Sequence, residues 1–219
     1  SAEVGTQQAQ ALGEKAEFVQ LDVTDEQAAE QFFKDVLVKH GAVHGLVNCA
    51  GIGPSAKVVG KDGVHDLGMF SKTLQINVTG TFNMLRLAAE AMSKNEVAEG
   101  DEDRGVIVNT ASVAAFDGQI GQAAYSASKG AVVAMTLPIA RELARHAIRI
   151  MVIAPGIMET PMLKGLPQNV QDALGQMVPY PSRLGRPEEF ARLVAHIAEN
   201  SYLNGEVIRL DGGIRMAAK

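Results

Sequence analysis

Three side chains within one short segment could carry out proton chemistry, and they are Ser112, Tyr125 and Lys129. Tyr125 and Lys129 are four positions apart, so on a helix they share one face. An ammonium close to a phenol favours the phenolate, because the positive charge stabilises the negative one. The Ser112 hydroxyl can donate a hydrogen bond to a carbonyl oxygen while Tyr125 exchanges a proton with it. The combination indicates general acid–base chemistry at a carbonyl or an alcohol.

The local sequence predicts the elements that position these side chains. Residues 105–108 are short, apolar and mostly β-branched, which is typical of a buried strand that ends just before Ser112. Glycines at 118 and 121 indicate a loop, and a helix is expected to begin near Gln122. The hydroxyl therefore comes from a strand end and the Tyr–Lys pair from the following helix.

The composition favours one globular α/β domain over residues 1–219 and excludes several other classes. The chain is 47% hydrophobic and 21% charged, so it can form a core and is not disordered. A net charge of -5 without a Lys/Arg run makes a nucleic acid an unexpected partner. No apolar run approaches the roughly 18 residues of a membrane span, so no membrane association is expected.

Cys49 is the only cysteine, which excludes an internal disulfide and fits a reducing compartment. We therefore expect a soluble intracellular protein, cytoplasmic or, if its source is eukaryotic, in the mitochondrial matrix. The five histidines show no metal-ligand spacing, and no metal is expected. The stretch 51–56 matches a Gly-x-Gly-x-x-Ala dinucleotide pattern, but Pro54 and the polar residues that follow indicate a loop instead of the helix this motif requires.

Strands alternate with helices along the chain, which predicts a doubly wound, Rossmann-like parallel sheet of the α/β class. The expected strands are residues 18–23, 45–51, 105–108, 148–154 and 205–213, and the expected helices are 2–12, 26–39, 69–95, the segment from 122 and 187–199. Residues 54–68 are expected to be a loop. Residues 157–185, rich in methionine and proline, are expected to form a mobile lid over the substrate.

The arrangement of Ser112, Tyr125 and Lys129 resembles the catalytic signature of the short-chain dehydrogenase/reductase family. The resemblance implies that Tyr125 transfers the proton, Lys129 lowers the pKa of its phenol and binds a ribose, and Ser112 holds the carbonyl oxygen. It also implies that Asn77 supports a water in a proton relay to the lysine.

The same resemblance implies an NAD cofactor and assigns residues to it. The implied cofactor-binding residues are Asp22, Val23, Asn48, Cys49, Ala50, Gly51, Thr110, Tyr125, Lys129, Pro155, Gly156, Ile157 and Thr160, with Thr160 followed by Pro161. The implied substrate-binding residues are Ser112, Gln119, Gln122 and Tyr125.

A narrower resemblance within the family lies in residues 54–68, 92–96, 109–116, 118–125 and 181–185. It implies a homotetramer that oxidises a small-molecule secondary alcohol with NAD, such as a 3-hydroxyacyl-CoA or a hydroxysteroid. Two alternatives remain open at this point. One is an NADPH-dependent 3-ketoacyl-acyl-carrier-protein reductase, and the other is a non-catalytic member of the fold that acts as a binding scaffold.

Family members begin with a glycine-rich βαβ unit that is not found in this sequence. In the family's strand order, its two strands lie between residues 18–23 and 46–49. We therefore expect a gap of roughly 14 Å between these two segments, at about 4.8 Å per strand spacing. The alternative is that 18–23 pairs directly with 46–49.

Overall fold

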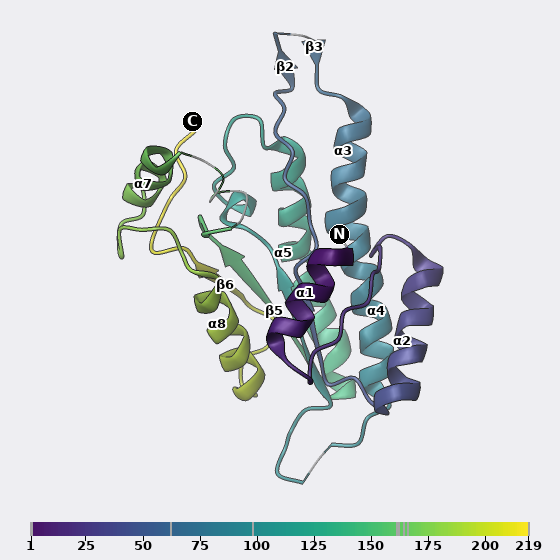
Figure 1. The fold of residues 1–219 in the computed structure, drawn as a ribbon. Helices are drawn as coiled ribbons and strands as arrows, with labels where there is room; N and C mark the ends of the chain where they lie inside the picture. The colour runs from purple at the N-terminus through teal and green to yellow at the C-terminus, as the bar shows by residue number, and fades with distance from the viewer. Residues whose placement is uncertain are drawn as a thin grey trace.

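Four parallel strands form the central sheet of the computed structural model, which describes residues 2–61, 63–97, 99–160, 163, 165 and 167–218 (Figure 1). The strands are β1 (Gly45–Asn48), β4 (Gly105–Thr110), β5 (Ile148–Pro155) and β6 (Val207–Leu210). They lie in the order β1-β4-β5-β6, and every neighbouring pair is parallel. This confirms the Rossmann-like fold class.

The helices cover the sheet and connect its strands. They are α1 (Ala2–Leu12), α2 (Glu26–His40), α3 (Leu67–Leu74), α4 (Thr81–Ser93), α5 (Ala123–Leu143), α7 (Gln168–Gln176) and α8 (Pro187–Glu199), with a π-helix η1 (Gln75–Gly80) and 3-10 turns η2 (Val113–Ala115) and η3 (Ala144–His146). In Figure 1, α2, α4 and α5 lie on one side of the strands and α8 lies on the other.

The central strands β4 and β5 are buried on both faces, because the side chains of a strand alternate between the two faces and helices cover each face. All but the last residue of β5 are buried. Ile148 and Ile150 join the cluster built with α2, α4 and α5, whereas Met151 and Ile153 pack with Ile197 of α8. The near-continuous apolar run of β5 thus reflects burial on both sides.

The prediction of a strand at 18–23 is wrong. These residues belong to no sheet in the described structure, and the side chains of Phe18 and Val19 are 36% and 51% exposed. An extended segment becomes a strand only when a neighbour accepts and donates its ladder hydrogen bonds. The described part of the chain contains no such bonds between 18–23 and β1, so the alternative of direct pairing is not found either.

Other elements differ from the predictions in detail. The loop expected at 54–68 contains a short antiparallel hairpin of β2 (Val59–Gly60) and β3 (Gly63–Val64), which projects from the body in Figure 1. The single helix expected at 69–95 is instead the succession α3, η1 and α4. The strands expected at 45–51 and 205–213 are shorter, because β1 and β6 end where the chain turns away from the sheet.

None of the described helices combines the length and apolar character that a membrane span requires.

The helix α1 buries no side chain. Its Gly5 nevertheless lies against the ring of Phe18, since a Cβ at this glycine would come within 2.1 Å of that ring.

Replacing Ile150 by alanine should lower the free energy of unfolding by about 2–5 kcal/mol, because the cavity adds to the lost transfer energy. Ile150 is 0% exposed in the middle of the sheet. Urea unfolding of both proteins measures the difference. The control is Val38→Ala, at a side chain that is 89% exposed and should change stability by no more than about 0.5 kcal/mol. Equal effects of the two substitutions would contradict this account of the core.

Candidate active site

Tyr125 and Lys129 lie on one face of α5, close to its N-terminus. The Nζ atom of Lys129 is 5.8 Å from the centroid of the Tyr125 ring. The helix begins at Ala123 with Gln122 as its N-cap residue, so Tyr125 stands in the first turn. The four-residue spacing therefore places the Lys129 ammonium beside the Tyr125 phenol, as the sequence predicts.

Lys129 is a buried cation with one hydrogen bond to the sheet. Its side chain is 6% exposed, and Nζ donates to the backbone carbonyl of Thr110, the last residue of β4, at 2.7 Å. Burial lowers the pKa of the Lys129 ammonium from 10.5 to about 8, and Cys49 opposes this shift by favouring the charged form. The Thr110 hydroxyl in turn donates to Sγ of Cys49 at 3.7 Å. These contacts join α5 to the ends of β4 and β1.

Ser112 follows β4 and is the N-cap residue of η2. Its Oγ accepts a hydrogen bond from the backbone N–H of Ala114 at 3.1 Å. Since a serine hydroxyl both donates and accepts, this contact leaves its hydrogen available for a substrate oxygen. Local capping thus orients Ser112 without using its donor.

Asn77 lies in the π-helix η1 and is completely buried. Its Oδ1 accepts from the backbone N–H of Ile52 at 2.8 Å, and its Nδ2 donates to the Ile52 carbonyl at 2.8 Å and to Oγ of Ser128 at 2.9 Å. π-helical turns inside α-helices are frequent at functional sites. The asparagine fixes the loop after β1 against α5.

Ser128 is a residue of this site that the sequence reasoning missed. It is completely buried, and its hydroxyl donates to the backbone carbonyl of Tyr125 at 2.7 Å while accepting from Asn77. Its position three residues after Tyr125 puts it on a neighbouring part of the helix surface, which is a signal that could have found it.

Small residues after β1 leave the backbone open next to Lys129. A Cβ on Gly51 would lie 3.2 Å from Oδ1 of Asn77 and 3.6 Å from Nζ of Lys129, and one on Gly53 would lie 3.5 Å from the Tyr125 ring. Cys49, Ala50 and Gly51 are exposed, whereas Asn48 is buried and donates to Oδ1 of Asn109 at 2.9 Å. Such small residues let a ligand approach the backbone closely next to the Lys129 ammonium.

Asp22 and Val23 are held by local contacts and by α4, since the strand predicted for them is absent. Oδ1 of Asp22 accepts from the N–H of Thr24 at 2.9 Å and from its hydroxyl at 2.8 Å. These hydrogen bonds lower the pKa of Asp22 and keep it anionic. The carbonyl of Val23 accepts from Nδ2 of Asn83 at 3.0 Å.

The segment after β5 adjoins a different cavity. Pro155 ends β5, the N–H of Gly156 donates to the Leu210 carbonyl at 2.9 Å, and the Ile157 carbonyl accepts from Gly185 at 2.9 Å. Thr160 is exposed, and the neighbouring Pro161 lies outside the described residues. Gly185 is the last residue of the segment expected to form the lid, so this hydrogen bond joins the two ends of that segment.

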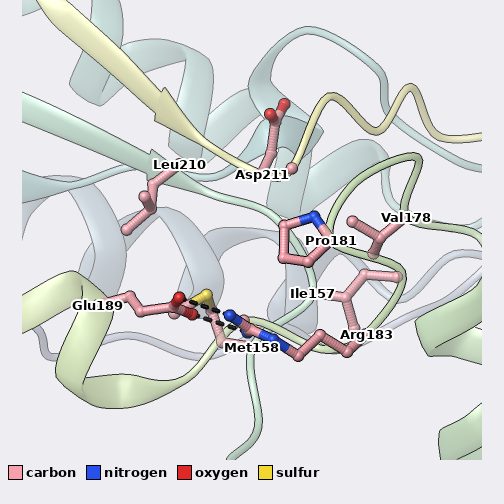
Figure 2. Close-up of a pocket in the computed structure, with 10 residues that line it drawn as sticks. Ile157, Met158, Val178, Pro181, Arg183, Glu189, Leu210 and Asp211 are labelled. Carbon is pink, nitrogen blue, oxygen red and sulfur yellow. Dashed lines mark hydrogen bonds and ion pairs between the residues drawn. The ribbon is translucent and has the colours of Figure 1, made fainter.

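The cavity has a volume of ≈ 230 Å³ and lies between this segment and the end of β6 (Figure 2). Its lining residues are Ile157, Met158, Val178, Pro181, Arg183, Gly185, Glu189, Leu210, Asp211 and Gly212. Ser112, Tyr125 and Lys129 do not line it, so this cavity is not the place of the proton chemistry. Arg183 pairs with Glu189 along one side at 2.8 Å, and the hydrogen bond from Arg183 lowers the pKa of Glu189 to about 2.

Gln119 and Gln122 are tied to each other and to the C-terminal segment. Oε1 of Gln122 accepts from the N–H of Gln119 at 3.0 Å, and Nε2 of Gln119 donates to the Ala217 carbonyl at 3.1 Å. Both belong to the loop that leads into α5.

Within the described residues, no group of three His, Cys, Asp or Glu side chains is arranged to hold a metal ion.

Comparison with known sequences gives consistent matches. The sequence model of the family described as short chain dehydrogenase matches residues 1–171. The 3-hydroxyacyl-CoA dehydrogenase type-2 of Homo sapiens is 53% identical over 214 residues, which are 97% of this chain and 82% of the human protein. The 3-oxoacyl-acyl-carrier-protein reductase of Thermotoga maritima is 35% identical over 209 residues, covering 94% of this chain and 80% of that protein.

The fold is also similar to that of a solved structure. The crystal structure of 3-hydroxyacyl-CoA dehydrogenase type-2 from Mycobacterium avium matches with a TM-score of 0.94 and 38% sequence identity, covering 100% of this chain and 85% of that one. The doubly wound sheet, the Tyr125–Lys129 pair and these matches lead to one conclusion. The chain belongs to the short-chain dehydrogenase family of oxidoreductases.

Proposed function

We propose that this protein interconverts a secondary alcohol and a ketone with NAD, and that its substrate is a 3-hydroxyacyl-CoA, with hydroxysteroids as further candidates. The observation that carries the proposal is the Tyr125 ring beside the buried Lys129 ammonium. The substrate class is supported by the higher identity to 3-hydroxyacyl-CoA dehydrogenase type-2, 53%, than to the acyl-carrier-protein reductase, 35%.

In the proposed mechanism, the Tyr125 hydroxyl exchanges a proton with the substrate oxygen as general base or acid. The Lys129 charge stabilises the phenolate that forms when Tyr125 gives up its proton. Ser112 donates its hydroxyl hydrogen to the same substrate oxygen and so stabilises the charge that develops there. Asn77 and Ser128 keep the first turn of α5 and the Ile52 backbone in place around these groups.

NAD would be held by residues that border this site. Lys129, Tyr125 and Thr110, together with the small residues Cys49, Ala50 and Gly51, would meet its nicotinamide ribose, while Pro155, Gly156, Ile157 and Thr160 would meet the nicotinamide. The buried side chain of Asn48 would support residues 49–51. Asp22 and Val23 would contact the adenine. When bound, NAD supplies the hydride acceptor of the oxidation.

We propose that residues 157–185 cover the substrate, with Gln119 and Gln122 contacting it from the opposite side. The motive is the apolar character of the described part of this segment, which includes Ile157, Met158 and Val178; the cavity that they border in Figure 2 lies beside the site of proton chemistry and does not contain it. Met side chains adapt to irregular apolar ligands such as an acyl chain.

A homotetramer is proposed as the working form. Phe82 on α4 is 47% exposed, and a groove between α4 and α5 contains Leu85 and Ile139 together with the charged Arg86 and Glu142. Exposed apolar surface on two adjacent helices supports packing against a second copy. We place the protein in the cytoplasm, or in the mitochondrial matrix of a eukaryote, where the single thiol of Cys49 would stay reduced.

Tyr125→Phe should lower kcat by roughly 10²–10⁴-fold, because it removes only the hydroxyl that transfers the proton. Steady-state oxidation of a 3-hydroxyacyl-CoA measures the loss, and NADH fluorescence should show nearly unchanged cofactor binding. Tyr202→Phe, at a side chain that is 98% exposed, makes the same exchange away from the site and serves as the control, with activity expected to stay unchanged. Activity of Tyr125→Phe within a few-fold of the unmodified protein would contradict the proposed function.

NAD should be preferred over NADP, because the chain has a net charge of -5 and an anionic Asp22 on the proposed adenosine side. The 2′-phosphate of NADP would add a negative charge next to an acidic surface. Comparing kcat/KM for the two cofactors decides the point. A preference for NADP would favour a reductase of acyl-carrier-protein thioesters instead.

Lys129 should titrate near pH 8 in the folded protein without cofactor, because burial disfavours its charged form. Between pH 8 and 10.5 the unfolded chain then binds more protons than the folded one, so stability should rise with pH as far as this lysine is concerned. NMR of the protein after reductive ¹³C-methylation follows the titration, and Lys129→Arg identifies the resonance. A titration midpoint of the Lys129 resonance near pH 10.4, the pKa of a free lysine, would contradict the prediction that burial lowers the pKa of Lys129.

A further inference from the structure

Arg209 of β6 is the centre of a group of contacts that the proposed mechanism does not use. Its Nε donates to Oδ2 of Asp211 at 2.7 Å, and its Nη2 donates to Oδ2 of Asp117 at 2.6 Å and to the Ile214 carbonyl at 3.0 Å. Its guanidinium also lies 5.3 Å from the centroid of the Phe116 ring. We call these five residues the Arg209 network.

The charged side chains of the network are partly shielded from solvent, which strengthens their ion pairs. The side chains of Arg209, Asp117 and Asp211 are 21%, 17% and 7% exposed. The pKa of Asp117 is lowered chiefly by its hydrogen bond from Arg209. A planar guanidinium offers several donors in a fixed geometry and can hold two carboxylates at once, which a lysine ammonium does less well.

One side of the network holds the loop that leads to the catalytic helix. Phe116 and Asp117 lie between Ser112 and Tyr125, directly before Gln119 and Gln122. The loop also donates two hydrogen bonds to the C-terminal segment. The Gln119 side chain donates to the Ala217 carbonyl at 3.1 Å, and the Ile120 N–H donates to the Ala218 carbonyl at 3.0 Å. Arg209 anchors that segment as well through Ile214.

The other side of the loop is tied to the segment after β1. The N–H of Ala56 donates to the Gly121 carbonyl at 2.9 Å, and Gly121 has a φ of 89°, a conformation that favours glycine. The loop is thus clamped between residues 55–56 and the C-terminal segment. Its position depends on both attachments.

The other carboxylate of the network adjoins the segment proposed to hold the nicotinamide. A Cβ on Gly156 would lie 2.9 Å from Cα and Cβ of Asp211, and the Gly156 N–H donates to the carbonyl of Leu210. Asp211 also borders the cavity of Figure 2 together with Ile157 and Met158. Arg209 therefore connects the substrate loop to the cofactor segment through two carboxylates.

We propose that Arg209 is a positioning residue that sets the distance between the substrate loop and the cofactor segment, and that it thereby determines substrate affinity. The proposal rests on the proposed function, because it takes Gln119 and Gln122 as substrate contacts. Arg209 has no contact with Ser112, Tyr125 or Lys129 among the described interactions, so the proton chemistry should continue without it.

The test compares Arg209→Gln with a matched surface variant. Arg209→Gln should raise KM for a 3-hydroxyacyl-CoA roughly tenfold and leave kcat within about threefold, which is the signature of lost binding energy. Arg209→Lys should recover part of the affinity, because an ammonium can still pair with one carboxylate. The control is Arg215→Gln: Arg215 contacts the same Asp211 at 3.2 Å but is 64% exposed, and KM should stay within about twofold.

Asp117→Asn provides a second variant in case Arg209→Gln does not fold. It weakens only the arm to the loop and leaves the pair between Arg209 and Asp211 in place. It should raise KM in the same direction. If KM rises no more in Arg209→Gln and Asp117→Asn than in Arg215→Gln, or if kcat falls while KM is unchanged, the proposal is overturned.

Hydrogen exchange gives a readout that does not depend on turnover. Amides of residues 116–122 and 214–218 should exchange faster in Arg209→Gln than in the unmodified protein, while β4 and β5 stay protected. Uniformly faster exchange throughout the chain would mean a general loss of stability and would overturn the proposal. If the unmodified protein does not oxidise a 3-hydroxyacyl-CoA, the proposed function fails, and the exchange comparison alone decides whether Arg209 holds the loop.

Discussion

The burial of the Lys129 ammonium is the constraint on which the rest of the site depends. A cation taken out of water is costly unless it finds an acceptor. Lys129 finds one in the Thr110 carbonyl at the end of β4, and its pKa is nevertheless lowered to about 8. The lysine therefore stays in place only while β4 ends beside the first turn of α5. Both neighbours of β4 in the sheet hold it there, so the strand order is part of the chemistry.

A second layer of contacts keeps the groups around Lys129 from moving apart. Asn77 uses both ends of its amide on the Ile52 backbone and reaches Ser128, which in turn bonds the Tyr125 carbonyl. Asn77 lies in the π-helical turn at 75–80, and its side chain is completely buried. Buried polar networks of this kind rigidify a site when every member finds a partner. The rigid geometry matters because proton transfer requires close contact between donor and acceptor.

The loops at the carboxyl ends of the strands form the rest of the site, as in other open α/β sheets. The loop after β1 supplies small residues, the loop after β4 supplies Ser112 and the two glutamines, and the segment after β5 borders a cavity. Polar links such as the Arg209 network help to place these loops relative to one another, and they connect the C-terminal segment to the substrate loop.

The sequence by itself determined the four strands of the sheet, the helices α1, α2, α5 and α8 and the Tyr125–Lys129 pair, because periodicity, capping and spacing are local properties. The family was indicated by the resemblance of Ser112, Tyr125 and Lys129 to its catalytic signature. The division of residues 67–93 into α3, η1 and α4, and the helix α7, were not predicted. That residues 18–23 form no strand could not be predicted, since a strand exists only when another strand pairs with it. The π-helix at Asn77, the role of Ser128 and the contacts of Arg209 were likewise decided by tertiary structure. Each arises where segments far apart in the chain meet, as Asp117 and Arg209 do, and no local pattern encodes such a meeting.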